Sequence, residues 1–424
     1  MSDLLTELQS RGMVMDHTPG LAARLSQGPI TGYVGFDPTA ESLHVGNLVP
    51  VMALAWLQRL GHRPLVIVGG GTGMVGDPSG KRTERPMLSV EQIDANVAAI
   101  RAQLSRFLEF TGPHAATLFN NADWLRDLTL MEFLRDTGKH FTISYMLQKE
   151  AVKSRLDSGI SFTEFGYMLV QAHDYDHLFE QEHCELQMGG ADQWGNITAG
   201  IELIGKKRGA QVHGLTVPLL TTASGAKFGK SEGGNIWLDP AQTSPYQFYQ
   251  FWINQDDRDV DRLLKTFSFR PLPGIAELMR AHRAAPEQRL AQRELAGEMT
   301  GRIHGEAEAA KAREAAEALF GRTGGQAGGR AEDALLMAEM PEVLIPAAEF
   351  GEGLPFSDVL VRAGLASSKA DARRGIEGKG YYVSEEPWAD PFGRLARSAL
   401  VERDGVLMTI LRKGKKNYVR LVVK

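Results

Sequence analysis

The sequence predicts an α/β fold: a parallel sheet with crossover helices, then an α-helical region, then a small α+β module. Three observations predict it. Strand-like and helix-like segments alternate over the first 110 residues. A run rich in Ala, Glu, Arg and Leu follows at residues 285–320, and a glycine-rich stretch separates it from a basic C-terminal piece. Such alternation is typical of strands joined by helices in one sheet.

The N-terminal elements follow in order. Residues 30–36 (ITGYVGF) and 64–70 (PLVIVGG) are apolar runs that predict buried strands, and residues 49–61 and 91–110 predict helices. Pro50 fits a first helical turn, where its missing N–H is not needed, and Gly61 can end the helix. Ligands of such sheets bind where strands run into helices, so the loops after these strands form the candidate site.

Composition limits the possible functions. The 424 residues are 43% apolar and 23% charged, which is ordinary for a globular protein. The single cysteine, Cys184, excludes an intramolecular disulfide and fits a reducing compartment. The first residues lack the apolar core of a signal peptide, and no run of about 18 apolar residues exists to span a membrane. We therefore expect a cytoplasmic protein with no membrane partner.

Charge is distributed unevenly along the chain. Residues 351–424 carry 14 Lys and Arg against 9 Asp and Glu, whereas the whole chain has a net charge of −5. A basic end on an acidic body indicates a polyanionic partner, although a solvated charged face explains the charge equally well. We expect four segments: a sheet domain with an inserted helical connection (1–222), a glycine-punctuated loop and helical domain (223–320), a linker (321–350) and a C-terminal module (351–424).

Polar residues occupy the joint GFDPTAESLHVGN, between a predicted strand and a predicted helix. His44 and Asn47 stand just before that helix, whose free N–H groups attract phosphate. Gly46 leaves room for a flat ring to approach the backbone. The alternative interpretation is that Asn47 only caps the helix and His44 packs within the loop.

Two other glycine-rich stretches carry charge. Gly71-x-Gly73-x-x-Gly76 matches a dinucleotide fingerprint, but a turn at 77–80 stands where that fingerprint needs a helix. We therefore expect these glycines to pass beneath a ligand, with Asp77 as a fixed carboxylate. Downstream, AKFGKSEGG holds Lys227 and Lys230. A mobile loop with two ammonium groups can close over a polyphosphate; an exposed basic turn is the alternative.

Together these stretches resemble one family. HVGN resembles the HIGH signature, and KFGKS the KMSKS signature, of class I aminoacyl-tRNA synthetases. With GFDPTA, GGADQWGNI and SFTEFGYMLVQAHDYDHLF, the chain resembles the bacterial tyrosyl-tRNA synthetases over essentially its whole length. Two departures stand out: Asn47 replaces the second histidine of HIGH, and Phe228-Gly229 replaces Met-Ser of KMSKS.

The resemblance implies a Rossmann-like catalytic domain, a homodimer, and the substrates L-tyrosine, ATP with Mg²⁺, and tRNA(Tyr). It implies no tightly bound cofactor and no protein metal site. The tyrosine carboxylate attacks the α-phosphorus of ATP, so the site must orient substrates and stabilise phosphate charge without a general base. Catalytic roles are implied for Thr39, His44, Asn47, Lys227, Lys230 and Ser231. ATP contacts are implied for Gly35, Asp37, Thr39, His44, Gly46, Asn47, Gly190, Asp192 and Lys230.

A polar stripe points to the amino-acid substrate. Tyr167, Gln171 and Asp174 are spaced by four and three residues, so on a helix they share one face. If that face is buried, these groups need partners; if it is exposed, the stripe is merely solvated. The resemblance implies that Tyr33 and Asp174 bind the phenol oxygen, that Asp77, Tyr167 and Gln171 bind the ammonium group, and that Gln187, Gln193 and Asn121 complete the pocket, with Asn121 supporting Asp77.

The tail predicts an RNA-binding module. FSDVLVRAGLASSKADARRGIEGKGYYV predicts helix, turn, helix and strand, and a hairpin with a basic turn follows. This pattern resembles the S4-type RNA-binding domain. An exposed Tyr381 or Tyr418 would suit base stacking, whereas a small domain packed on its neighbour is the alternative. The basic residues expected to contact RNA are Lys369, Arg373, Arg374, Lys413, Lys415 and Lys416.

Three other functions remain open at this point. A sibling synthetase for tryptophan shares much of the architecture, but Tyr33 and Asp174 match a phenol better than an indole N–H. A non-catalytic RNA-binding protein on a synthetase scaffold would have a broken nucleotide site, yet His44, Lys227 and Lys230 are present. A nucleotidyltransferase of the same superfamily would not need the basic tail.

Overall fold

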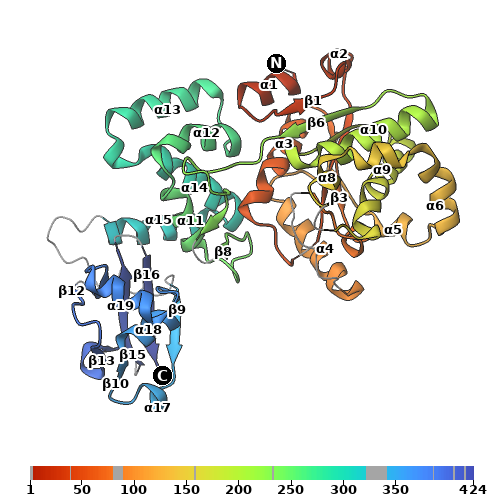
Figure 1. Cartoon of the computed structure of the whole chain (residues 1–424). Helices are drawn as coiled ribbons and strands as arrows, with labels where there is room; N and C mark the ends of the chain where they lie inside the picture. The colour runs from red at the N-terminus through yellow and green to blue at the C-terminus, as the bar shows by residue number, and fades with distance from the viewer. Residues whose placement is uncertain are drawn as a thin grey trace. The chain divides into compact units, whose positions relative to one another are not determined.

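The computed structural model describes residues 3–38, 40–79, 89–156, 159–231, 234–320, 341–384, 386–403, 406–414 and 417–424. The chain forms two compact units (Figure 1). The first comprises Met1–Thr243 and Phe251–Ile303, and the second comprises Ser244–Gln250 and His304–Lys424. None of the described helices is long and apolar enough to cross a membrane.

A six-stranded sheet forms the centre of the first unit, in the order β1-β6-β5-β2-β3-β4. Five neighbouring strands run parallel, and β1 at the edge pairs antiparallel with β6. The predicted strands at 30–36 and 64–70 are present as β2 and β3, which confirms the α/β fold class. The strands are β1 (Asp16–His17), β2 (Thr31–Phe36), β3 (Arg63–Val68), β4 (Thr117–Asn120), β5 (Cys184–Gly190) and β6 (His213–Val217).

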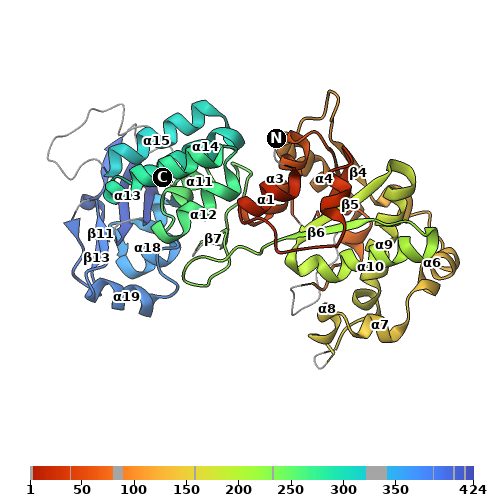
Figure 2. The ribbon, with the colours of Figure 1, turned by 90° about the horizontal axis from the view of Figure 1, so that it is seen from above.

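Helices cover both faces of this sheet. Successive residues of a strand point to opposite faces. A Cβ on Gly32 of β2 would lie 3.2 Å from Leu57 of α3 (Leu48–Arg59), whereas Tyr33 packs edge-on against Tyr175 of α9 (Phe162–Glu182), with ring centroids 5.3 Å apart. Figure 2 shows α10 (Trp194–Arg208) alongside α9. The sheet is therefore enclosed between α3 on one face and the α9–α10 pair on the other.

Buried ion pairs fix α9 in this position. Asp176 accepts from Lys207 Nζ at 2.7 Å and pairs with Arg208, both at the end of α10. At the other end of α9, Glu164 accepts from two nitrogens of Arg155 at 2.9 Å each. Breaking a buried pair leaves an uncompensated charge, so the polar face of α9 is held in one orientation towards the sheet.

α4 connects β3 to β4, and four short helices of the described residues connect β4 to α9. The helix predicted at 91–110 is present as α4, although it ends earlier than expected. Thr129, the N-cap of α6, accepts the N–H of Glu132 and binds its carboxylate in return, which is a complete capping box. The connecting helices are α4 (Val90–Leu104), α5 (Ala122–Leu125), α6 (Leu130–Asp136), α7 (Ile143–Leu147) and α8 (Glu150–Lys153).

The N-terminal segment is joined to the downstream helices by one arginine. Arg11 follows α1 (Leu4–Ser10), is buried, and donates to the backbone carbonyls of Lys265, Ser268 and Arg270. The helical run predicted at 285–320 is two helices, because Gly305, with φ +94°, interrupts it. One further helix, α2 (Leu21–Leu25), follows Arg11. The helices after residue 244 are α11 (Pro245–Ile253), α12 (Asp257–Phe267), α13 (Leu272–Ala284), α14 (Leu290–His304) and α15 (Glu306–Phe320).

The C-terminal part of the second unit is a small mixed α and β structure. Its main sheet has the order β12-β11-β15-β16-β9, with β14 also paired to β15. The predicted pair of helices and the hairpin are present as α18, α19 and β15–β16. Its elements are β9 (Glu342–Ile345), α17 (Ala347–Phe350), β10 (Gly353–Pro355), α18 (Phe356–Arg362), α19 (Lys369–Glu377), β11 (Tyr381–Val383), β12 (Glu386–Pro387), β13 (Arg394–Ala396), β14 (Val401–Arg403), β15 (Val406–Lys413) and β16 (Asn417–Val423).

Part of the segment predicted as a linker belongs to this sheet. β9 pairs in parallel with β16, and Ile345 and Phe350 are buried in the core of the module. Residues 342–350 are therefore structural, whereas residues 321–340 lie outside the described residues. β9 has only four residues and pairs with the distant β16, so the local sequence does not mark it as a strand.

Candidate active site

The carboxyl ends of the parallel strands bring the predicted polar residues to one edge of the sheet. Asp37 follows β2, Asp77 follows β3, Asn121 follows β4 and Asp192 follows β5. Ligands of open parallel sheets bind at this edge, where the strand order reverses. That point lies between β2 and β5, since the chain continues from β2 to β3 on one side and from β5 to β6 on the other.

Asp174 of α9 is a buried carboxylate held by neutral donors. Asn121 Nδ2 donates to one of its oxygens and Trp124 Nε1 to the other, each at 2.8 Å. Burial raises the pKa of Asp174 to about 7; the two hydrogen bonds oppose this rise and the charge of Asp37 adds to it. Trp124 stacks on His177, with centroids 4.3 Å apart. The carboxylate is therefore positioned firmly but is not neutralised by these donors.

Two buried polar atoms near Asp174 have no hydrogen-bond partner among the described residues. They are Tyr33 Oη and Gln187 Oε1, which lie side by side on β2 and β5. Burial raises the pKa of Tyr33, and the nearby charge of Asp174 raises it further, so this phenol remains a donor. Buried polar groups are normally paired. The arrangement therefore fits a ligand group that donates to Asp174 and accepts from Tyr33.

A second polar network stands at the ends of β3 and β5. Gln193 Nε2 donates to Asp77 Oδ2 at 2.7 Å. Asn196 Nδ2 lies 3.1 Å from the side-chain oxygens of both Gln193 and Gln171. One amide nitrogen thereby fixes two carbonyl oxygens next to a carboxylate. Such a set of acceptors suits an ammonium group.

The HVGN loop is fixed by a short antiparallel pairing with residues 236–238. Val45 N donates to the carbonyl of Ile236 at 2.9 Å, and the His44 ring packs edge-on against Trp237 with centroids 5.8 Å apart. Asn47 does not cap α3 through its side chain; its Oδ1 accepts the N–H of His44 at 3.0 Å. Asn47 thus fixes the histidine backbone ahead of the helix N-terminus.

The KFGKS loop touches the HVGN loop through glycine. Gly229 has φ +85°, and a Cβ there would lie 2.9 Å from the backbone nitrogen of Gly46. Its carbonyl accepts from Ile236 N at 3.0 Å. No side chain fits between the two backbones at this distance, so the glycine that departs from KMSKS is required by the contact.

The residue before that glycine anchors the loop. The buried ring of Phe228 packs against Phe251, Trp252 and Phe267, with centroids 5.4–5.7 Å apart. The second departure from KMSKS is therefore an aromatic anchor, which fixes the chain between the two lysines of the loop.

Electrostatic coupling connects this loop to the end of β5. Burial raises the pKa of Asp192, the charge of Asp77 adds to that rise, and the charge of Lys227 opposes it. A Cβ on Gly190 would lie 2.6 Å from an oxygen of Asp192, and a Cβ on Gly35 would meet open space. The glycines at the ends of β2 and β5 therefore leave room above the sheet edge.

Comparison with known proteins shows the family of this chain. The family model described as tRNA synthetases class I (W and Y) matches residues 25–321, more than half of this chain. The chain belongs to this family. The tyrosine–tRNA ligase of Anaeromyxobacter dehalogenans (strain 2CP-C) is 57% identical over 424 residues, covering 100% of both chains. That of Roseiflexus castenholzii (strain DSM 13941 / HLO8) is 50% identical over 429 residues, with the same coverage.

A solved structure agrees with this assignment. The C-terminally truncated mitochondrial tyrosyl-tRNA synthetase of Aspergillus nidulans is 33% identical, with a TM-score of 0.68 over 76% of this chain and 95% of that chain. The chain is therefore a class I aminoacyl-tRNA synthetase. The class I fold expected from the two signatures is thereby confirmed.

The structure brings most of the predicted synthetase residues together at this edge, but not all of them can be described. Thr39 lies outside the described residues. For Lys230 and Ser231 only the backbone is described, as β7, which pairs with β8 (Gly234–Asn235). The described site residues are Tyr33, Gly35, Asp37, His44, Gly46, Asn47, Asp77, Asn121, Tyr167, Gln171, Asp174, Gln187, Gly190, Asp192, Gln193 and Lys227.

Asn121 has a different partner from the one expected. It donates to Asp174 and to Thr72 Oγ1, and its oxygen accepts from Gly71 N at 2.7 Å, so it connects the glycine loop to Asp174 rather than supporting Asp77. Trp124 and Asn196 were missed in the sequence. The only signal was their place in NNADW and GGADQWGNI, the loops that follow β4 and β5.

The basic residues expected to bind RNA lie in the C-terminal module. Lys369 pairs with Asp358 at 2.9 Å, and the guanidinium of Arg373 stands 4.8 Å over the ring of Phe392. Arg374, at the side of α19, is 3.9 Å from Asp371. These three basic side chains therefore lie on α19, and each is next to an acidic or aromatic side chain of the module.

The second basic element is the end of the β15–β16 hairpin. Lys413 is the last residue of β15, and Arg412 stands 3.7 Å over the ring of Tyr382. Lys415 and Lys416 lie outside the described residues. The expectation of an exposed Tyr381 is wrong, because its ring is 1% exposed and its hydroxyl donates to the carbonyl of Leu365. The alternation of the strand turns this ring into the core.

Substituting Gly229 with alanine tests the contact between the two signature loops. We expect Gly229→Ala to lower the rate of amino-acid-dependent ATP–pyrophosphate exchange by about tenfold or more, because a left-handed alanine costs about 1–2 kcal/mol and its Cβ also meets Gly46. The matched control is Gly225→Ala, since Gly225 has φ +84° but its Cβ would point into open space. Equal losses in both variants would contradict the contact.

Proposed function

We propose that the residues at this sheet edge form tyrosyl-adenylate and that the basic C-terminal module helps to hold tRNA(Tyr). The protein is a tyrosine–tRNA ligase, as its family and its full-length relatives establish. It therefore uses tyrosine, ATP and tRNA as substrates in protein biosynthesis. The proposal concerns the residues that carry each step, the metal ion, the oligomeric state and the cellular compartment.

The observation that carries the tyrosine assignment is the buried pair of Tyr33 and Asp174. The hydroxyl of a bound tyrosine donates to the Asp174 carboxylate and accepts from the unpartnered Tyr33 Oη. An indole N–H would satisfy only the acceptor, and phenylalanine neither. Because an unpaired buried polar group costs about 1–3 kcal/mol, both are disfavoured. Asp77, Tyr167 and Gln171 bind the ammonium group, with Gln193 next to the carboxylate.

The first chemical step needs positioning and charge stabilisation. A tyrosine carboxylate oxygen bonds to the α-phosphorus of ATP as the bond from that phosphorus to the bridging oxygen breaks, and pyrophosphate leaves with the electron pair. His44 and the N–H groups at the start of α3 face the phosphates. Lys227 and Lys230 bind the departing pyrophosphate from their loop, and Asp192 binds the ribose hydroxyls.

Mg²⁺ enters this scheme with ATP. Among the described residues, no group of three His, Cys, Asp or Glu stands where it could hold a metal ion. Mg²⁺ keeps several waters and binds readily to substrate phosphates, so the phosphates of ATP are its main ligands here. It supplies neutralisation of phosphate charge, while the lysines and helix N–H groups orient the chain of phosphates.

The second step transfers tyrosine to a ribose hydroxyl at the 3′ end of tRNA(Tyr). Lys369, Arg373 and Arg374 on α19, with Lys413 to Lys416 at the hairpin, contact tRNA phosphates. Phe392, 73% exposed and paired with Arg373, offers a ring on which a base can stack. We assign the protein to the cytoplasm, where tRNA and ATP are available and a single cysteine stays reduced.

An apolar face of the first unit fits a second copy of this chain. Large exposed apolar side chains lie between β4 and the first residue of α9, on α6, on α7, in the turn after α8 and at the start of α9. Faces of this kind on a monomer indicate an interface, and most soluble oligomers are symmetric dimers. The proposed homodimer therefore uses this face. Its residues are Leu130, Met131, Leu134, Ile143, Leu147, Leu156 and Phe162.

The experiment that tests the function is exchange of labelled pyrophosphate into ATP, with each of the 20 amino acids and without tRNA. We expect exchange with tyrosine only, because one hydroxyl satisfies both Tyr33 and Asp174. Tyr33→Phe should reduce the preference for tyrosine over phenylalanine while leaving exchange measurable. Exchange driven by tryptophan would overturn the pocket assignment, and exchange with no amino acid would overturn the catalytic proposal.

Asp174 should make tyrosine binding depend on pH. With a pKa of about 7, its ionised fraction rises between pH 6 and pH 8, and the phenol bonds more strongly to the ionised form. The KM for tyrosine should therefore fall about tenfold over that range. Asp174→Asn should abolish the dependence.

The same pKa has the opposite effect on folding without ligand. The folded protein keeps Asp174 protonated up to a higher pH than the ordinary carboxyl pKa of 3.8 allows. The contribution of Asp174 to stability is therefore fully present below pH 3.8 and is lost as the pH rises through about 7. A KM for tyrosine that stays constant from pH 6 to pH 8 would contradict the role given to Asp174.

Phe162→Asp tests the proposed dimer. The ring of Phe162 is 82% exposed, so the substitution has little effect on the fold of one subunit but places a charge in the interface of a dimer. Sedimentation equilibrium should show the unsubstituted protein as a dimer and the variant as largely monomeric. Phe392→Asp, in the second unit, is the matched control and should remain dimeric. A dimeric Phe162→Asp would exclude this face.

A further inference from the structure

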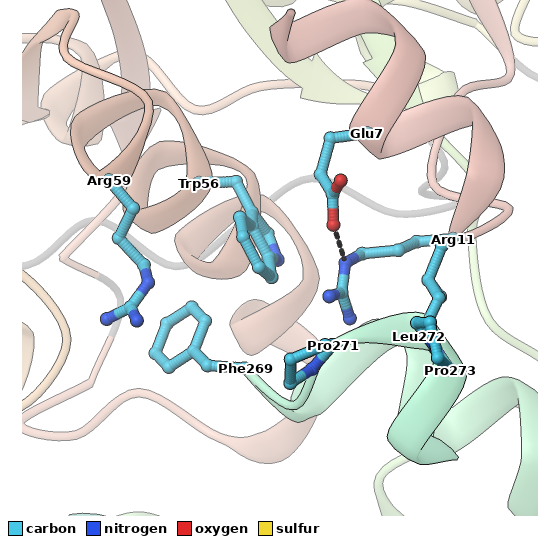
Figure 3. A pocket seen from close by; sticks show the side chains of 8 residues that line it. All are labelled: Glu7, Arg11, Trp56, Arg59, Phe269, Pro271, Leu272 and Pro273. Carbon is cyan, nitrogen blue, oxygen red and sulfur yellow. Dashed lines mark hydrogen bonds and ion pairs between the residues drawn. The ribbon is translucent and has the colours of Figure 1, made fainter. Parts of the chain in front are cut away.

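A cavity of about 460 Å³ lies at the end of α3 opposite to the nucleotide-binding residues. It is bounded by Arg11 after α1, by Trp56 and Arg59 of α3, and by Phe269 and residues 271–273 before and within the start of α13 (Figure 3). The 12 residues of α3 span about 18 Å at 1.5 Å per residue. The cavity is therefore separate from the active site, which is at the N-terminal end of the same helix.

Arginines and aromatic rings alternate along its wall. The guanidinium of Arg11 stands 4.0 Å from the ring centroid of Trp56, and Arg59 and Arg302 stand 4.4 Å and 4.1 Å from that of Phe269. Burial lowers the pKa of both Arg11 and Arg302, and the charge of Arg59 lowers each further. Arg302 lies behind Phe269 and outside the lining, which holds Arg11 and Arg59 against one carboxylate, Glu7, so the net charge of the lining is positive.

One of these arginines has no acidic partner. Arg11 pairs with Glu7 at 2.8 Å and Arg302 with Glu298 at 2.7 Å. Arg59 is exposed at the mouth of the cavity, and no carboxylate in the described part of the chain pairs with it. One guanidinium is thus available for an anion, already held flat by Phe269.

Hydrogen-bond donors of two kinds border the cavity: backbone N–H groups at the start of α13 and the indole N–H of Trp56. α13 begins at residue 272, and its N-cap, Pro271, has no side chain that could cap the helix. Because Pro273 has no N–H, the first-turn donors that can attract an anion are the N–H groups of Leu272 and Gly274. Trp56 is 8% exposed and its Nε1 has no partner among the described residues. In Figure 3 the nitrogen edge of this indole turns towards Arg11 and Glu7.

We propose that this cavity binds a nucleotide, with its phosphate on Arg59 and the N-terminus of α13 and its base against the exposed Pro271 and Pro273. Arginine matches phosphate in geometry, and a flat base can also stack on the plane of a guanidinium. The same chemistry is present in a free nucleotide and in a nucleotide of RNA. Both occur among the substrates of this enzyme.

The test uses the full-length protein. In one arm, the active site is filled by tyrosyl-adenylate, formed from tyrosine and ATP with pyrophosphatase, and equilibrium dialysis measures binding of labelled AMP. In the other arm, filter binding without tyrosine or ATP measures the affinity for tRNA over a range of salt concentrations. Arg59→Ala should weaken AMP binding about tenfold if the ligand is a free nucleotide. If the ligand is part of tRNA, the variant should weaken tRNA binding and lower the salt slope by about one.

Arg280→Ala is the matched control, because Arg280 is an exposed arginine further along α13 and the charge change is the same. It should leave both affinities unchanged, and Arg59→Lys should be intermediate in the affected arm. Tyrosine-dependent pyrophosphate exchange without tRNA should be unchanged in all three variants, which separates this site from the proposed function. The proposal is overturned if Arg59→Ala and Arg280→Ala behave alike in both arms.

Discussion

A close approach of Gly229 to the backbone of Gly46 joins the HVGN and KFGKS loops, the two halves of the proposed nucleotide site. The strands deliver four polar loops to one sheet edge without further help, since parallel strands end together. The loop that carries Lys227 and Lys230 is different, because it extends well beyond the end of β6. Its place is set by that glycine contact and by the pairing of Val45 with Ile236. The charge available to the phosphates therefore depends on two residues without side chains.

The proposed amino-acid recognition depends on a carboxylate whose hydrogen-bond donors are neutral. A cation beside Asp174 would lower its pKa and stabilise the empty protein, but it would also satisfy the oxygen that must accept from the substrate. Asn121 and Trp124 orient the carboxylate without neutralising it. The free protein consequently carries a cost that binding relieves, as expected where a site is arranged for its ligand rather than for stability.

The sequence predicted the features that are local. Apolar runs predicted β2, β3 and α3, and the spacing of Tyr167, Gln171 and Asp174 placed three polar residues on one face of α9 but left the burial of that face open. The two signatures predicted the family. The sequence did not predict features made by distant contacts. Trp124 meets Asp174 only because α9 packs against the residues that follow β4. β9 becomes a strand only by pairing with β16, about 75 residues later. The Arg59 cavity joins segments more than 200 residues apart. The burial of Tyr381 likewise depends on strand register.

The aromatic anchor at Phe228 has a consequence for the speed and strength of phosphate capture. Ordering a free residue costs about 1–2 kcal/mol, and a long unattached loop would incur that cost along its whole length at each turnover. With one ring fixed among Phe251, Trp252 and Phe267, the loop is divided into two short spans that meet at a stationary point. Lys227 and Lys230 then stand on either side of a fixed residue. Ordering the loop around a phosphate therefore costs less conformational entropy in each catalytic cycle.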